Sequence, residues 1–128
     1  MAFHLVPQHG EDVWINAWNW RCTLEILRTE HLVDDQALEL WGCNCGATVD
    51  DTLAQQIAEV LTRRLAEMRP GDRVRADMSI TAEPQRPVVF RPGMSADEID
   101  PVDMYSAHYE WLVQFRDFCK RSAGFFIG

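Results

Sequence analysis

The sequence has no hydrophobic run that approaches the ~18 apolar residues of a membrane-spanning helix. Its first residues also lack the basic region and apolar stretch of a secretory signal peptide. We therefore expect a cytoplasmic protein, in which the four cysteines are reduced. Lysine is scarce too: Lys120 is the only lysine among the twelve lysine and arginine residues, a bias typical of GC-rich bacterial genomes.

Several motifs that carry common enzyme chemistries are also missing. The chain has no glycine-rich dinucleotide or phosphate loop, no Gly-x-Ser-x-Gly nucleophile elbow and no His-Glu-x-x-His zinc helix.

Positively charged residues are in the minority, because 20 acidic residues against 12 basic residues give a net charge of −8. Such a field repels phosphate backbones and anionic lipids, so we expect neither nucleic acid nor membrane as a partner. It attracts a basic protein partner, although negative charge also simply keeps a small protein in solution.

The composition is that of an ordinary folded domain. The 128 residues are 47% hydrophobic, and no repeat or long linker divides them. We predict one globular domain over residues 1–128. Its expected fold class is α+β and helix-dominated, with three main helices, one short helix and a small two- or three-stranded sheet.

The spacing of the hydrophobic residues locates these elements. The predicted main helices cover residues 12–30, 49–69 and 101–121, and the short one covers 35–41. Predicted helix caps are Asp12, Thr48 with Asp51, Ser95 with Glu98, and Asp100. The predicted strands cover residues 3–6, 73–81 and 88–90. Residues 125–127 are apolar, and we expect them to pack onto the sheet or onto a partner.

The most unusual segment is the tryptophan cluster, residues 14–21, in which three of the five tryptophans lie within seven residues. Each indole N–H needs a partner when it is buried, whereas a plain core helix uses side chains without polar atoms. Tryptophan and arginine are also the residues that dominate binding energy at protein interfaces. The cluster is therefore a structural network, a protein interface or a small-molecule site. Its candidate binding residues are Asn16, Trp18, Asn19, Trp20 and Arg21.

Two cysteines, Cys43 and Cys45, lie in a glycine-flanked turn and are weak candidates for a metal site or a thiolate nucleophile. Metal-binding turns usually space cysteines as Cys-x-x-Cys, and no second pair follows. The possible further ligands are scattered along the chain: Cys22, Cys119, His4, His9, His31 and His108. We therefore expect no metal and no cofactor, with Cys22 and Cys119 as small buried hydrophobes. His108 is expected to face the core, as a hydrogen-bonded residue or a general base.

The chain resembles a set of small uncharacterised bacterial proteins. These share an early helix of the Asn-x-Trp-x-Trp kind, matched here by Asn16, Trp18 and Trp20, and a Gly-Asp-Arg-Val turn into a strand, matched by residues 71–74. The resemblance implies no activity and no catalytic residues. Some acidic bacterial proteins of this size are immunity proteins that neutralise a toxin.

These observations favour a small non-catalytic interaction protein, of the immunity or accessory type, that binds another protein. The alternative is a metal- or thiol-dependent enzyme that uses Cys43 and Cys45. The chain is expected to be a monomer or a homodimer, with residues 125–127 or an edge strand as the dimer contact. No catalytic residue is assigned.

Overall fold

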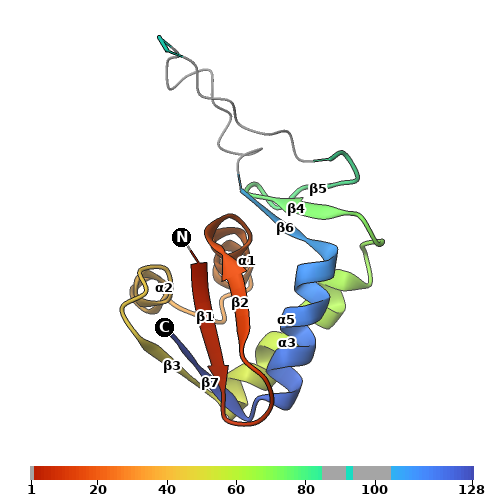
Figure 1. Cartoon of the computed structure of the whole chain (residues 1–128). Coiled ribbons are helices and arrows are strands. Elements are labelled where there is room, and N and C mark those ends of the chain that lie inside the picture. The colour runs from red at the N-terminus through yellow and green to blue at the C-terminus, as the bar shows by residue number, and fades with distance from the viewer. Residues whose placement is uncertain (1, 85–91, 94–104) are drawn as a thin grey trace.

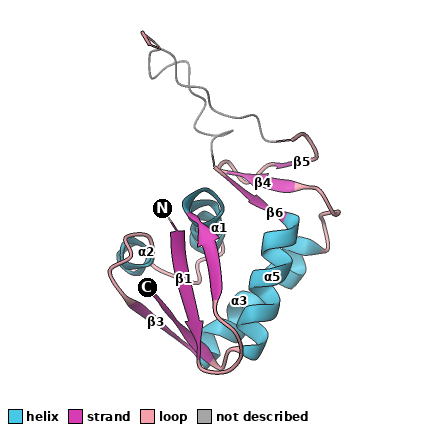
Figure 2. Cartoon of the chain, in the orientation of Figure 1, coloured by secondary structure: helices cyan, strands magenta, loops and turns pink. Residues whose placement is uncertain are grey.

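The computed structural model describes residues 2–84, 92–93 and 105–128. The described residues form helices and two small antiparallel sheets, which confirms the predicted α+β class (Figure 1, Figure 2). The strands are β1 (Ala2–Pro7), β2 (Val13–Asn16), β3 (Ala47–Asp50), β4 (Arg73–Arg75), β5 (Ile80–Thr81), β6 (Ser106–His108) and β7 (Gly124–Ile127). The helices are α1 (Ala17–Thr29), α2 (Asp35–Trp41), α3 (Asp51–Leu65) and α5 (Tyr109–Arg121).

The larger sheet has four antiparallel strands in the order β2-β1-β7-β3. Its strands alternate between buried and exposed side chains, so that one face is apolar and packs against the helices. In Figure 1 the strands β1 and β2 lie in front of α1, and α5 and α3 lie to the right of the sheet. The opposite face, here called the outer sheet face, carries the side chains of His4, Val6, Trp14, Thr48 and Phe126.

The core behind the sheet is rich in aromatic rings. The Trp20 ring from α1 meets the Phe115 ring from α5 edge-on, with the ring centroids 5.5 Å apart. Phe125 of the internal strand β7 meets the same Phe115 ring edge-on at 6.0 Å, so β7 packs against α5 and is linked to α1 through Phe115. Trp20, Phe115 and Phe125 are almost completely buried. Such pairs are worth about 0.5–1.5 kcal/mol each beyond the area that they bury.

The predicted helix over residues 12–30 is wrong over its first residues, which form strand β2. Val13 and Ile15 face the helices, and Trp14 pairs with His4 on the outer sheet face. The helix begins at Ala17 instead, because the Asn16 side chain accepts a hydrogen bond of 2.9 Å from the Asn19 backbone N–H. Asp12, the predicted cap, lies 2.7 Å from the His4 ring nitrogen Nε2.

Two further helices begin later than predicted. Residues 47–50 form strand β3, and α3 begins at Asp51 with Asp50 as its cap in place of Thr48. The last helix begins at Tyr109, because residues 106–108 form strand β6. Three predictions lie outside the described residues: the strand over 88–90, the caps at 95, 98 and 100, and the first part of the last helix, residues 101–104. The short helix over 35–41 is confirmed, with Asp34 as its cap.

The predicted strand over residues 73–81 is a hairpin of two short strands. β4 lies in the middle of the three-stranded sheet, between β5 and β6. The turn between β4 and β5 is stabilised by Asp77, whose side chain accepts hydrogen bonds from the Ser79 hydroxyl and backbone N–H. These two bonds lower the pKa of Asp77, because they favour its charged form. Met78 adopts a positive φ of 70°, which ends the alternation that the sequence suggested.

The C-terminal residues form β7, an internal strand of the four-stranded sheet. β7 pairs with β1 on one side and with β3 on the other, so its backbone is not free to contact a second chain. Only the ring of Phe126 is exposed there, at 44%. In the described part of the chain, no helix is both long enough and apolar enough to cross a bilayer.

Candidate functional site

The structure divides the tryptophan cluster into a buried part and an exposed part. Trp20 is fully buried, and its indole N–H donates to the Trp41 carbonyl oxygen over 2.9 Å. This bond attaches the C-terminal end of α2 to α1. The Asn19 side chain accepts a hydrogen bond of 3.0 Å from the His108 backbone N–H, which joins α1 to β6. Asn19 and Trp20 therefore join α1 to other elements, whereas Asn16 caps the start of α1.

Trp18 and Arg21 face outward from the first turns of α1. The Trp18 side chain is 42% exposed, and its ring lies 5.1 Å from the ring of Tyr105. The Arg21 guanidinium lies over the same Tyr105 ring, 5.6 Å from its centroid. Among the described residues no carboxylate lies within ion-pairing distance of Arg21. Tyr105 was not expected from the sequence, because it is far from the cluster along the chain and β6 brings it there.

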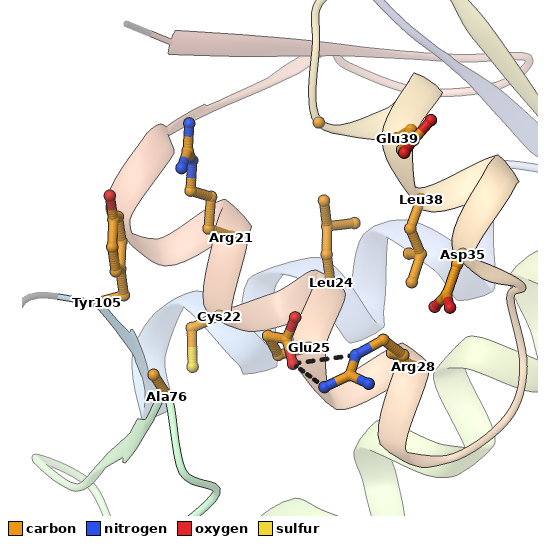
Figure 3. A pocket seen from close by; sticks show the side chains of 11 residues that line it. Arg21, Cys22, Leu24, Glu25, Arg28, Asp35, Leu38, Glu39, Ala76 and Tyr105 are labelled. Atoms are coloured by element: carbon orange, nitrogen blue, oxygen red, sulfur yellow. Dashed lines mark hydrogen bonds and ion pairs between the residues drawn. The ribbon is translucent and has the colours of Figure 1, made fainter. Parts of the chain in front are cut away.

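A groove with a volume of about 740 Å³ runs between α1 and α2, and we call it the α1–α2 groove (Figure 3). Leu24 and Leu38 supply apolar surface from the two facing helices. Tyr105 and Ala76 close one end. Volumes of this size are typical of sites that bind small molecules or side chains. The remaining lining residues are Arg21, Cys22, Glu25, Arg28, Asp35, Glu39 and Gly42.

Charge is distributed unevenly along the α1–α2 groove. Arg21 lies near Tyr105, whereas Asp35 and Glu39 project from the opposite wall (Figure 3). Between them, Glu25 accepts a hydrogen bond of 2.7 Å from Arg28, and this contact raises the pKa of Arg28. The groove therefore offers, at one end, a cation that pairs with no carboxylate of the described residues, and two exposed carboxylates at the other.

Trp14 lies elsewhere, on the outer sheet face. Its side chain is 63% exposed, and its ring stacks on the His4 ring at a centroid distance of 4.0 Å. The chain thus presents two exposed tryptophans, Trp18 at the groove and Trp14 on an edge strand of the sheet. Substitutions of Trp18 and Trp14 therefore allow the α1–α2 groove to be compared with the outer sheet face.

Cys43 and Cys45 form a disulfide bond with each other, which differs from the predicted reduced state of all four cysteines. Both residues are exposed in the turn between α2 and β3. Within the described residues, no three His, Cys, Asp or Glu side chains come close enough to hold a metal ion. In the disulfide form neither sulfur is a thiolate, which is the species that binds metal or attacks a substrate.

Cys22 and Cys119 are buried free thiols, as predicted. Burial raises the pKa of Cys22 to about 11, and it raises the pKa of Cys119 as well. The Cys22 sulfur also lies 3.1 Å from the Val74 carbonyl oxygen. His108 ends strand β6 next to α5, rather than lying within a helix on the core face.

The raised pKa of Cys22 predicts that stability falls at high pH. The unfolded chain loses the Cys22 proton near pH 9, whereas the folded chain keeps it until about pH 11. The stabilisation is therefore complete below pH 9 and is lost as the pH rises through this window. We expect the free energy of unfolding, measured in urea, to fall by about 2 kcal/mol more in the wild type than in Cys22→Ala between pH 8.5 and pH 11. Parallel pH curves for the two proteins would contradict this assignment.

Comparisons with known proteins give no relative: no family model, no curated protein and no solved structure matches the chain.

Proposed function

We propose that this chain is a small interaction protein that binds a segment of another protein in the α1–α2 groove, and that the groove is a non-catalytic binding surface. The observation that carries this proposal is the group formed by the exposed Trp18 and Arg21 and the half-buried Tyr105 at the mouth of the groove. These three residue types supply most of the energy at measured protein interfaces, where they fill or line desolvated pockets. An immunity or accessory protein is the concrete form of this proposal, with the cytoplasm as its compartment.

The chemistry of the α1–α2 groove indicates what kind of segment fits it. An acidic side chain of the partner would pair with Arg21, and a basic one with Asp35 or Glu39. Between these ends, Leu24 and Leu38 offer surface for an apolar side chain. The net charge of −8 accelerates encounter with a partner that is basic overall.

The test compares Trp18→Ala with the matched control Trp14→Ala, because both tryptophans are exposed and only Trp18 adjoins the groove. The probes are the purified products of the genes next to its own, titrated into each variant by calorimetry. We expect one of them to bind the wild type and Trp14→Ala equally, and to bind Trp18→Ala about 30-fold more weakly, which corresponds to ~2 kcal/mol. Circular dichroism checks that both variants are folded.

Two results would count against the proposal. If none of these probes binds the wild type, the proposal that the groove binds a protein loses its support. Equal weakening by Trp14→Ala and Trp18→Ala moves the contact away from the groove and toward a surface that both variants disturb.

A further inference from the structure

The turn that joins α2 to β3 carries the Cys43–Cys45 disulfide, in which Asn44 alone separates the two bonded residues. All three residues of this small ring are exposed. The other two cysteines are buried, and their raised pKa values keep them as unreactive thiols. The accessible sulfur chemistry of the described chain is therefore concentrated at this turn.

This disulfide contributes little to stability. Cross-linking stabilises a fold mainly by restricting the unfolded chain, and the gain grows with the length of the loop that is closed. A ring closed around one intervening residue lies at the low end of that relation. The turn is also shaped by its own backbone, since Asn44 and Gly46 have positive φ values of 57° and 85°. Stabilisation of the fold therefore does not explain why this disulfide is present.

Backbone carbonyl oxygens lie close to both sulfurs of the disulfide. The Cys43 sulfur lies 3.4 Å from the Leu40 carbonyl oxygen, and the Cys45 sulfur lies 3.4 Å from the Cys43 carbonyl oxygen. A disulfide sulfur has no proton to donate, whereas each thiol of the dithiol can donate to its neighbouring carbonyl. Both sulfurs are exposed, and the rate of thiol–disulfide exchange depends on the access of the attacking thiolate to the disulfide.

We propose that the Cys43–Cys45 pair is a redox-active disulfide that oxidises dithiols of other proteins or peptides. A substrate thiolate attacks one sulfur of the pair, so that an intermolecular S–S bond forms and the Cys43–Cys45 bond breaks. The sulfur that leaves takes up a proton. The second substrate thiolate then attacks the substrate sulfur of the mixed disulfide, and the second cysteine leaves and is protonated.

The step is balanced in atoms and electrons. Two electrons and two protons pass from the substrate dithiol to the pair, which ends as Cys43 and Cys45 thiols, while the substrate ends as a disulfide. A low-molecular-weight disulfide, such as oxidised glutathione, returns the pair to its starting form by the reverse exchange. This activity does not depend on the α1–α2 groove, so either proposal can fail without the other.

The first experiment is a redox titration of the full chain in glutathione buffers of varied composition. Acid quenching, alkylation and mass spectrometry then report the state of each cysteine. We expect the pair to pass completely from disulfide to dithiol across the series, and both exposed thiols of the dithiol to be alkylated at least ~100-fold faster than Cys22 and Cys119. A pair that stays a disulfide in excess reduced glutathione, or that never oxidises, would overturn the proposal.

The second experiment measures the oxidation itself. A reduced synthetic peptide with a Cys-x-x-Cys sequence is mixed with one equivalent of the disulfide form. We expect nearly one equivalent of peptide disulfide, and only the uncatalysed background with the Cys43→Ser, Cys45→Ser double variant, which keeps both buried cysteines. In the single variant Cys45→Ser, the Cys43 thiolate should attack oxidised glutathione, retain one glutathione as a stable mixed disulfide and release the other as reduced glutathione. A peptide that stays reduced with the wild type contradicts the proposed reaction.

Discussion

Replacing Trp20 by alanine is expected to lower the free energy of unfolding by about 3–5 kcal/mol. The side chain is fully buried, and its ring packs against Phe3 and Phe115 from two other elements. Its indole N–H also bonds the Trp41 carbonyl oxygen, so the change removes the bond that attaches α2 to α1. The measurement is urea denaturation followed by circular dichroism.

Two controls separate packing from hydrogen bonding within the tryptophan cluster. Trp20→Phe keeps most of the ring volume but leaves the Trp41 carbonyl without its donor, so we expect a loss of about 1–3 kcal/mol. Trp18→Ala removes an exposed ring that contacts Tyr105, and should cost about 1 kcal/mol or less. Equal losses for Trp18→Ala and Trp20→Ala would refute the division of the cluster into a buried part and an exposed part.

A second large effect is expected at Gly124, where replacement by alanine should lower the free energy of unfolding by about 3 kcal/mol. Gly124 begins β7 with a φ of 102°, which L side chains rarely adopt. A Cβ atom there would lie 2.8 Å from the Val49 carbonyl oxygen, which belongs to the backbone of the paired strand β3. The backbones of β7 and β3 cannot move apart without disturbing the sheet. The strain of the positive φ and the overlap of the Cβ atom with Val49 therefore both lower the free energy of unfolding.

Gly71→Ala is the matched control for this prediction. Gly71 has a similar φ of 92°, but no atom lies within 4 Å of the position that a Cβ would take. It should therefore lose only the conformational part, about 1–2 kcal/mol, in the same denaturation experiment. If both variants lose the same amount, the close approach of β7 to β3 is not a constraint on residue 124.

The helices were the most predictable part of the fold, and their starting residues the least. Val13 and Ala17 match the four-residue spacing of a helix, but Val13 and Ile15 also match the two-residue alternation of a strand. Pairing with β1 decides between the two patterns, and the pairing partner is not visible in the local sequence. The Asn16 cap marks the start of the helix, which the hydrophobic pattern alone does not locate.

Long-range pairing explains one further difference, and local contacts explain another. Residues 125–127 read as a short apolar tail, yet they become an internal strand because β1 and β3 supply partners on both sides. The region from 73 to 81 alternates throughout, but the Asp77–Ser79 contacts and the backbone hydrogen bonds of the turn convert it into a hairpin. Such local side-chain bonds compete with a continuous strand and are weak signals in a sequence.

The candidate site was predicted in part. The segment from Asn16 to Arg21 was singled out, but the sequence did not show which side chains are buried and which face outward. The spacing along a helix does not reveal that Trp20 meets Trp41, or that Tyr105 meets Trp18 and Arg21. Both contacts depend on the path of residues distant in the chain, and so does the α1–α2 groove itself.

Hydrogen-exchange mass spectrometry tests the central claim, that the α1–α2 groove is the binding surface, most directly. Exchange is followed in the chain alone and in its complex with the neighbouring gene product that binds it. The proposal predicts slower exchange at residues 17–29 and 35–41, which form the two walls of the groove, and unchanged exchange at residues 13–16 of β2. Protection confined to β1 and β2, with the groove helices unchanged, would place the partner on the outer sheet face and contradict the proposal.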